Sequence, residues 1–230
     1  MAERKDYVAV IYNEQDRPYT AYPDQLCQYL FERYAMKPHA RLLDLGCGRG
    51  EFLRGFVRCG MEAFGADQSL LAKKINPEAE IRQADFSSTT IPYDDNSFSY
   101  VFSKSVLEHF YYPENLVAEI NRVLQPGGLV ITMVPDWESV YRMFYDDYTH
   151  RTPFTQTSLK DFLLINGFDQ VSCEKFRQLP FLWRRPWLKF SANIIDWLCP
   201  DSLKKYHKVI RFSKEGMLLA SATKPTGDQT

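Results

Sequence analysis

A glycine-rich segment early in the chain has residue types that suit ligand binding through the backbone. The sequence over residues 42–52 is LLDLGCGRGEF, which places alternate glycines at Gly46, Gly48 and Gly50. Glycine is required where the backbone approaches a ligand closely or takes a positive φ. The apolar residues before these glycines predict a strand and those after them a helix, and ligands bind at such junctions in parallel sheets. We therefore predict a binding turn here.

The spacing of the glycines indicates what kind of ligand the turn binds. Nucleotide-dependent dehydrogenases have G-x-G-x-x-G, whereas this turn is G-x-G-x-G and has Glu51 where the third dehydrogenase glycine would be. Asp44, at the end of the predicted strand, would repel a pyrophosphate but suits a ligand that bears an ammonium group. The alternative is a glycine turn without a ligand.

The segment resembles motif I of the class I S-adenosylmethionine-dependent methyltransferases, in the form found in small-molecule methyltransferases. The resemblance extends over about residues 40–135. It implies S-adenosylmethionine as the cofactor and a Rossmann-like α/β fold. Within motif I it implies cofactor contacts for Asp44, Gly46, Cys47, Gly48 and Gly50.

Further residues match this family at the ends of the next predicted strands. Asp67 and Gln68 follow the second strand, and the resemblance implies that Asp67 accepts hydrogen bonds from both ribose hydroxyls, a favourable bidentate geometry. Asp85 and Phe86 follow the third strand. Asp85 is implied to accept from the adenine amine, while Phe86 packs on the ring. Ser103, after the fourth strand, is implied to complete the cofactor site.

Two histidines are candidate catalytic residues on the acceptor side. Methyl transfer from a sulfonium requires alignment of the nucleophile with the methyl group, and a hydroxyl nucleophile also requires a base. His109 follows the fourth predicted strand and His150 lies in the loop after the fifth. Imidazole accepts a proton near neutral pH. Alternatively, His109 only supports the cofactor pocket, and His150 is a helix-entry residue bonded to Asp146 or Asp147.

The loop around His150 also supplies the predicted substrate contacts. We assign Tyr145 and Arg151 to the acceptor; Arg151 would bind an anionic acceptor or pair with the neighbouring aspartates. No metal is expected, because the sequence has no compact ligand cluster. Glu108, His109 and His150 could nevertheless converge in space.

A second, shorter resemblance concerns the acceptor. The sequence THRTPFT over residues 149–155, before a predicted helix that ends in NGF at 166–168, resembles methyltransferases linked to glycan or cell-surface polysaccharide assembly. It implies O-methylation of a small-molecule or glycan hydroxyl. The alternatives are N-methylation, methylation of RNA or protein, and an inactive cofactor-binding partner subunit. The Asp/Asn-Pro-Pro-Tyr motif of amino-group nucleic-acid methyltransferases is absent after the fourth strand.

Residues 176–214 form a predicted helical insertion rich in aromatic and basic residues. Three of the four tryptophans fall here, and residues 175–214 hold ten Lys and Arg against two Asp. We expect short helices over 186–198 and 201–212. This composition suits a membrane surface with anionic lipid, a lipid-linked glycan or a phosphate; the alternative is a lid or dimer surface. Nucleic acid is disfavoured as a partner, because the net charge of the chain is −1.

The elements that must position these residues alternate along the chain, which predicts a parallel sheet with crossover helices. Expected helices cover residues 19–36, 49–58, 70–74, 113–124 and 157–165, and expected strands cover 41–45, 62–66, 81–84, 98–102, 129–134, 170–175 and 217–223. The fold class is α/β, a Rossmann-like sheet of seven mostly parallel strands with helices on both faces. The resemblance implies that the last strand is antiparallel.

We expect one methyltransferase domain over residues 1–230. Its parts are an N-terminal helical segment (1–38), a cofactor-binding core (39–135), an acceptor loop, helix and strand (136–175), the insertion (176–214), and a last strand with its tail (215–230). The five cysteines are odd in number and have no C-x-x-C spacing, which argues against disulfides or zinc. With no apolar leader or spanning segment visible, we expect a cytoplasmic location, peripheral to the membrane if the insertion binds lipid.

Overall fold

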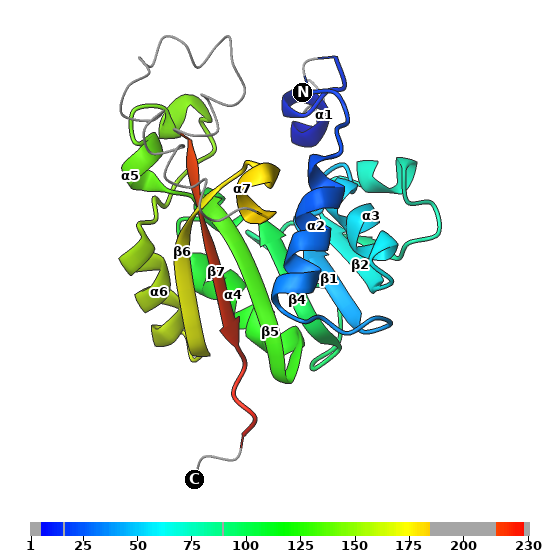
Figure 1. Ribbon diagram of the computed structural model, residues 1–230, viewed down its shortest axis with the longest axis vertical. Coiled ribbons are helices and arrows are strands. Elements are labelled where there is room, and N and C mark those ends of the chain that lie inside the picture. Colours follow the sequence, from blue (N-terminus) through cyan, green and yellow to red (C-terminus); the bar gives the residue numbers. More distant parts are fainter. Residues whose placement is uncertain (1–5, 16, 89, 185–214, 228–230) are drawn as a thin grey trace.

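The computed structural model describes residues 6–15, 17–88, 90–184 and 215–227, which fold around one sheet (Figure 1). The sheet has seven strands among these residues, in the order β3-β2-β1-β4-β5-β7-β6. The strands are β1 (Arg41–Leu45), β2 (Glu62–Asp67), β3 (Ile81–Gln83), β4 (Phe98–Lys104), β5 (Leu124–Pro135), β6 (Asp169–Arg177) and β7 (Gly216–Thr223).

The strand directions confirm the predicted fold class. β1 is central and pairs in parallel with β2 and with β4, and β4 pairs in parallel with β5. β7 is antiparallel to both β5 and β6. Reversal of the order at β1 and β4 creates a crevice at their carboxyl ends, where ligands bind in sheets of this kind.

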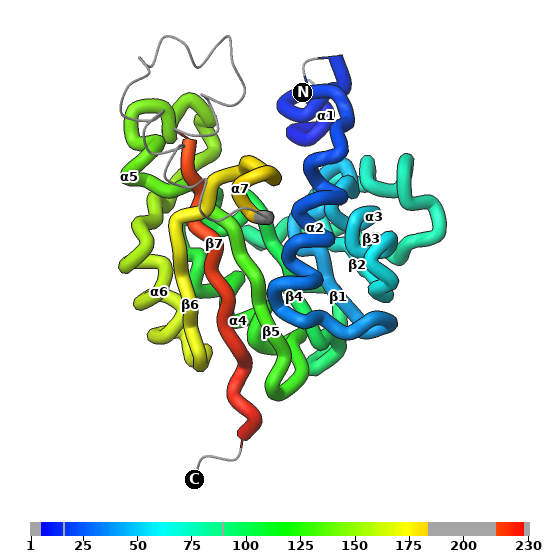
Figure 2. The backbone as a smooth tube through the Cα atoms, viewed as in Figure 1, coloured from blue at the N-terminus to red at the C-terminus, as the bar shows by residue number. Residues whose placement is uncertain are grey.

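Helices cover both faces of the sheet and bury its apolar side chains. α2 (Tyr22–Arg33) and α3 (Glu51–Arg58) pack on one face, where Leu30 and Phe56 are fully buried. α4 (Pro113–Val123) and α6 (Gln156–Ile165) pack on the other, with Ile120 and Leu159 in its core. Burial of such side chains supplies most of the stability of the fold. The sheet and the helices on its two faces thus form stacked layers (Figure 2).

Short elements lie mainly in the connections between the strands. They are α1 (Tyr7–Ile11), the 3₁₀ turns η1 (Leu71–Lys74), η2 (Leu107–His109) and η3 (Phe144–Asp146), and the helices α5 (Trp137–Val140) and α7 (Pro180–Arg184). α1 is absent from the sequence prediction, because five residues are too few to show a helical period. Its start is fixed by Asp6, whose carboxylate accepts from the amides of Val8 and Ala9. In Figure 1, α1 and α5 lie at the end of the molecule opposite the C terminus.

Among the predicted boundaries that differ from the structure, two change how a segment is assigned. β5 begins at Leu124 rather than at residue 129, because the segment 126–128 continues the strand as an irregularity, with Gly127 at a φ of 74°. β6 continues through Arg177, into the range expected to be the insertion, and α7 follows it. There the ring of Trp183 packs on Phe176, 5.3 Å between centroids, and on Tyr29.

The two helices expected over 186–198 and 201–212 lie outside the described residues, and so does the part of the proposed membrane-facing surface after residue 184. In the part of the chain that the structure does describe, every helix is too short or too polar to cross a lipid bilayer.

Candidate active site

The glycine turn between β1 and α3 is held tightly against its neighbours. The amide of Gly46 donates to the carbonyl of Ala66 at the end of β2, at 2.8 Å. Gly46, Gly48 and Gly50 all have positive φ values, of 74°, 52° and 80°. A Cβ at Gly46 would lie 2.4 Å from Cγ2 of Val106. The turn therefore needs glycine for its backbone shape, and it directly contacts the segment after β4.

Asp67 joins the glycine turn to the end of β2. Its two carboxylate oxygens accept from the backbone amides of Gly48 and Ser69, each at 2.8 Å. Burial raises the pKa of this carboxyl, while those two hydrogen bonds oppose the rise. Each oxygen has a further lone pair. Asp67 can therefore fix the turn and still accept a hydrogen bond from a ligand.

Asp44 is a buried carboxyl beside the same turn. It is 2% exposed, and its Oδ2 atom has no hydrogen-bond partner among the described residues. Burial, and next the charge of Asp67, raise the pKa of Asp44 to about 8. A buried, unpaired carboxylate is unfavourable unless a cation or a donor reaches it. This orphaned oxygen fits the prediction of a ligand with an ammonium group.

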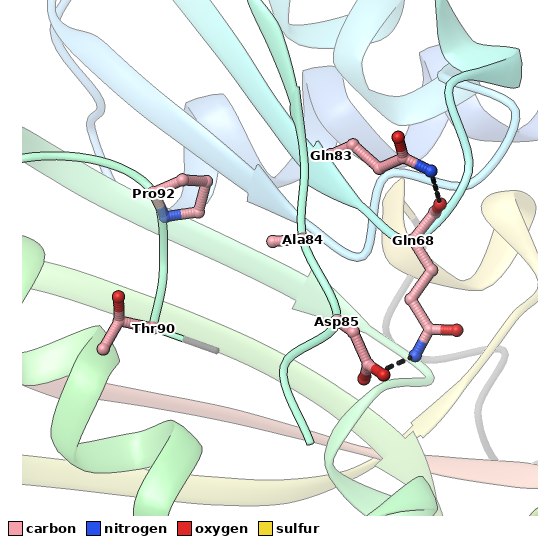
Figure 3. A pocket seen from close by; sticks show the side chains of 6 residues that line it. All are labelled: Gln68, Gln83, Ala84, Asp85, Thr90 and Pro92. Carbon is pink, nitrogen blue, oxygen red and sulfur yellow. Dashed lines mark hydrogen bonds between the residues drawn. The ribbon is translucent and has the colours of Figure 1, made fainter. Parts of the chain in front are cut away.

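A pocket of about 520 Å³ lies beyond the ends of β2 and β3 (Figure 3). Asp85 accepts from Nε2 of Gln68 at 3.1 Å, and Nε2 of Gln83 donates to the carbonyl of Gln68 at 2.8 Å. The pocket is thus lined by two residues assigned to the cofactor, Gln68 and Asp85, of which Asp85 was assigned to the adenine. Phe86 is half-buried against the core on the α4 side and is not among the lining residues.

Two residues assigned to the cofactor are enclosed by the sheet. The hydroxyl of Ser103 is fully buried and lies 2.9 Å from that of Thr132 on β5. This hydrogen bond joins β4 to β5, so the side chain of Ser103 is not presented to a ligand. Cys47 is also buried, and burial raises the pKa of its thiol. Any cofactor contact of these two residues must come through the backbone.

On the acceptor side, Glu108, His109 and His150 come together. One potential ligand atom from each side chain lies within 4.8 Å of the others. Glu108 is fully buried, and neither carboxylate oxygen has a hydrogen-bond partner in the described part of the chain. Burial raises the pKa of Glu108 to about 8, although the charge of Lys104 opposes the rise. The sequence allowed this convergence, and the structure confirms it.

The hydrogen bonds of the two imidazoles define which nitrogen carries the proton. Nδ1 of His150 lies 2.6 Å from the carbonyl oxygen of Phe144, which can only accept, so this nitrogen is the donor. Nδ1 of His109 lies 2.8 Å from Oγ1 of Thr149, whose own proton goes to Asp147 at 2.6 Å. His109 therefore also donates from Nδ1. With the proton on Nδ1, each ring in its neutral form has its lone pair on Nε2.

Backbone hydrogen bonds bring these two histidines together. The carbonyl of Glu108 accepts from the amides of Arg151 and Thr152, at 2.7 and 3.1 Å. The hydroxyl of Thr152 donates to the carbonyl of Phe110 at 2.7 Å. The loop after η3 is thereby joined to η2. The suggested bond of His150 to Asp147 is present in the backbone, where the amide of His150 donates to the carbonyl of Asp147 at 3.1 Å, whereas Nδ1 of the side chain bonds to Phe144.

The two predicted substrate residues lie on the outer side of this loop. Nη1 of Arg151 donates to the carbonyls of Tyr148 and His150, and its guanidinium lies 5.1 Å from the ring centroid of Tyr111. Tyr145 is 58% exposed. Its ring contacts Phe144 edge-on at 5.1 Å. The exposed rings of Tyr145 and Tyr111 thus belong to the rim of the cluster.

The N-terminal segment contributes contacts to the site that were not predicted from the sequence. The hydroxyl of Tyr7 donates to Oδ2 of Asp147 at 2.7 Å, and its ring lies 6.2 Å from that of His109. The hydroxyl of Ser69 donates to Asp6 at 2.6 Å. α1 therefore bridges the cofactor side and the acceptor side. The only sequence signal was Asp6, a helix-capping residue before a short apolar stretch.

Comparison with known proteins agrees with this arrangement. The model of a methyltransferase domain family matches residues 12–172. The chain belongs to this family. Its sheet order and glycine turn are those of the class I S-adenosylmethionine-dependent methyltransferases, so the predicted family and fold are confirmed.

Individual relatives differ in their acceptors. The chain is 25% identical to a sterol 24-C-methyltransferase of Gibberella zeae, over 86% of the chain and 59% of that protein. It is 33% identical to a ubiquinone biosynthesis O-methyltransferase of Bradyrhizobium, over 43% of the chain and 42% of that protein. It thus spans about half the length of these curated relatives. A phosphoethanolamine N-methyltransferase of Haemonchus contortus with bound S-adenosylmethionine superposes with a TM-score of 0.63, at 21% identity, over 87% of the chain and 52% of that structure.

The residues present fit S-adenosylmethionine. The orphaned Oδ2 of Asp44 suits its ammonium group, the glycine turn leaves room for close approach of a ligand to the backbone, and the pocket at Asp85 suits a flat polar base. The roles of the individual residues remain predictions from the resemblance.

Proposed function

We propose that the protein transfers the methyl group of S-adenosylmethionine to a hydroxyl oxygen of a small-molecule or glycan acceptor. The observation that carries this proposal is the pair of imidazoles, His109 and His150, each with Nδ1–H engaged and a lone pair on Nε2. A hydroxyl nucleophile must lose its proton, and neutral imidazole is the side chain best suited to accept it.

The position of the pair relative to the cofactor turn supports the same reaction. The contact between Gly46 and Val106 shows that the segment leading into η2 adjoins the turn expected to hold the cofactor. His109 is three residues beyond Val106. A hydroxyl between the pair and the methyl group would be aligned for in-line displacement. The O–H bond breaks as O–CH₃ forms, and the S–CH₃ electrons return to sulfur, leaving a neutral thioether.

The rim of the site suits an acceptor with flat apolar faces. Tyr111, Tyr112, Tyr145 and Tyr148 are each more than half exposed, at 58–73%. Exposed tyrosines offer a ring face for stacking and a hydroxyl for hydrogen bonding. The guanidinium of Arg151, stacked on Tyr111, adds a positive charge beside them. A sugar ring or a related polyol, carrying an anionic group, fits this combination.

The names of the relatives do not select the acceptor atom. They include methyl transfer to carbon, oxygen and nitrogen. The choice of oxygen therefore depends on the imidazole pair.

The decisive experiment supplies radiolabelled S-adenosylmethionine to the purified protein with a cell extract, which is then separated into organic-soluble, small aqueous and macromolecular fractions. We expect label in a hydroxyl-bearing small molecule or glycan, bound as a methyl ether. Label in the organic fraction would support a lipid-linked acceptor and contact through the insertion. Label on nitrogen, in RNA or in protein would overturn the proposal, as would protein that binds the cofactor but labels nothing.

A variant pair tests the role of the imidazoles. In His150→Asn, the amide can still donate to the carbonyl of Phe144, but the Nε2 lone pair is lost. We expect turnover to fall by about 100-fold with unchanged affinity for S-adenosylmethionine. His39→Asn is the matched control, because His39 is exposed, takes a positive φ of 60° that Asn tolerates, and precedes β1. Full activity of His150→Asn would remove that residue from the reaction.

A further inference from the structure

The carboxyl group of Glu108 is buried without an ion pair in the described part of the chain, although Lys104 and Ser105 partly offset the cost of its burial. It is fully buried, and neither oxygen makes a hydrogen bond there. Lys104 lies near enough for its charge to act on Glu108, but no ion pair joins the two side chains. Nζ of Lys104 instead lies 5.6 Å from the ring centroid of Phe52. A buried carboxylate is normally paired or bound to a metal.

The groups nearest to this carboxylate are metal ligands by type. His109 and His150 offer Nε2 lone pairs, and one potential ligand atom from each of the three side chains lies within 4.8 Å of the others. Two imidazoles and one carboxylate form the ligand set of many catalytic sites for divalent cations.

The outer hydrogen bonds also match those of a metal site. Metal-binding histidines usually donate their second N–H to a carbonyl or a carboxylate, which fixes the tautomer and the ring. His150 donates to the carbonyl of Phe144. His109 donates to the hydroxyl of Thr149, which in turn donates to Oδ1 of Asp147. Tyr7 donates to Oδ2 of the same carboxylate. Asp147 thus accepts a hydrogen bond at each of its two carboxylate oxygens and is the last acceptor of this chain of hydrogen bonds.

We infer that Glu108, His109 and His150 together bind one divalent first-row metal ion, such as Mn²⁺ or Zn²⁺. Bonds of about 2.0–2.2 Å bring ligand atoms to roughly 3.0–3.5 Å of one another. The ion would therefore draw the three side chains closer than the 4.8 Å limit found here. This inference replaces the expectation from the sequence that no metal takes part.

The role of the ion rests on the proposed O-methylation, whereas its binding does not. Three protein ligands leave coordination positions open for an acceptor hydroxyl. A hydroxyl held there loses its proton to water more readily. The oxygen then takes the methyl carbon, and the S–CH₃ electron pair stays on sulfur, so charge and atoms balance. The two histidines contribute to O-methylation in either case: without an ion they accept the proton of the hydroxyl, and with an ion bound they hold it while water accepts the proton.

The test measures metal binding to the full-length protein after removal of metals with a chelator. Isothermal titration with Zn²⁺ and electron paramagnetic resonance with Mn²⁺ are expected to show one site in the wild type and in His39→Asn. Glu108→Gln and His150→Asn are expected to weaken it on the order of 100-fold, and Thr149→Val about 10-fold through His109. Affinity for S-adenosylmethionine, measured in the same samples, should be unchanged.

Thermal unfolding adds a readout that does not depend on activity. The metal should raise the Tm of the wild type and of His39→Asn but not that of Glu108→Gln. In chelator, Glu108→Gln should unfold at the same or a higher temperature than the wild type, because the amide cannot ionise, whereas ionisation of a buried carboxyl without a partner is costly. Equal metal affinity in wild type and Glu108→Gln would overturn the inference, as would a folded, cofactor-binding wild type that takes up neither ion. Metal binding without transfer to oxygen would instead contradict only the proposed function.

Discussion

The imidazole rings of His109 and His150 lie 4.9 Å apart between centroids and cross at 62°. One ring belongs to η2 and the other follows η3, so two separate connections of the sheet supply one reactive surface. Both rings are fixed by hydrogen bonds at Nδ1. Because the same loop carries Thr149 and His150, a shift of that loop would change the environment of both rings together.

Gly46→Ala is expected to weaken binding of S-adenosylmethionine at least about 10-fold. The new Cβ would lie 2.4 Å from Cγ2 of Val106, at a φ of 74°, and such strain costs on the order of 1–3 kcal/mol. Isothermal titration measures the affinity. The matched control is Gly167→Ala, with a φ of 83° and open space around the new methyl. It should lose some stability but no affinity, and equal losses of affinity in both variants would refute the assignment.

Asp67→Asn is expected to weaken cofactor binding by about 10- to 100-fold. The two carboxylate oxygens accept from the amides of Gly48 and Ser69, whereas an amide side chain can accept on one side only. The other buried N–H then loses its partner, at a cost of about 1–3 kcal/mol. Asp161→Asn, on the exposed face of α6, is the control. Wild-type affinity in Asp67→Asn would show that Asp67 does not organise the cofactor turn.

Asp44 should make the stability of the cofactor-free protein depend on pH. Its pKa is about 8 in the folded chain against an ordinary value of 3.8. Because the pKa is raised in the folded chain, Asp44 contributes fully to the free energy of unfolding only below about pH 4. This contribution is lost as the pH rises toward 8, by at most about 1.4 kcal/mol per pH unit. The Asp44→Asn variant lacks this loss. Urea unfolding should therefore show that the free energy of unfolding falls more between pH 5 and pH 8 in the wild type than in the variant. An equal fall in both proteins would contradict the prediction.

Tyr7→Phe should affect the acceptor side of the site without affecting cofactor binding. It removes the hydrogen bond to Asp147 and keeps the ring beside His109. We expect faster amide exchange in α1 and roughly 10-fold slower turnover, because the support of His109 through Thr149 is weakened. Cofactor affinity should stay within about twofold. Tyr100→Phe is the control, since its hydroxyl accepts from the amide of Lys37 away from the site. Unchanged exchange and turnover in Tyr7→Phe would contradict the role given to α1.

The sequence alone determined the order of strands and helices, the glycine turn and the family, because these depend on local patterns. Alternation of apolar and turn residues fixed β1, α3 and β2 to within a few residues, and the positive φ values of Gly46 and Gly50 follow from the motif. The five-residue α1 was missed and the start of β5 misplaced, because a short helix shows no period and a Pro-Gly-Gly segment usually ends a strand.

Only the tertiary structure decided which side chains meet. The hydroxyl of Ser103 is bonded to Thr132 because β4 and β5 are neighbours in the sheet, which no local pattern reveals. The meeting of Glu108 with His109 and His150 depends on backbone hydrogen bonds between two loops that are distant in sequence. The pKa of a buried ionisable group such as Glu108 is set by the groups that surround it after folding. The chemistry of the acceptor side is therefore a product of the folded chain.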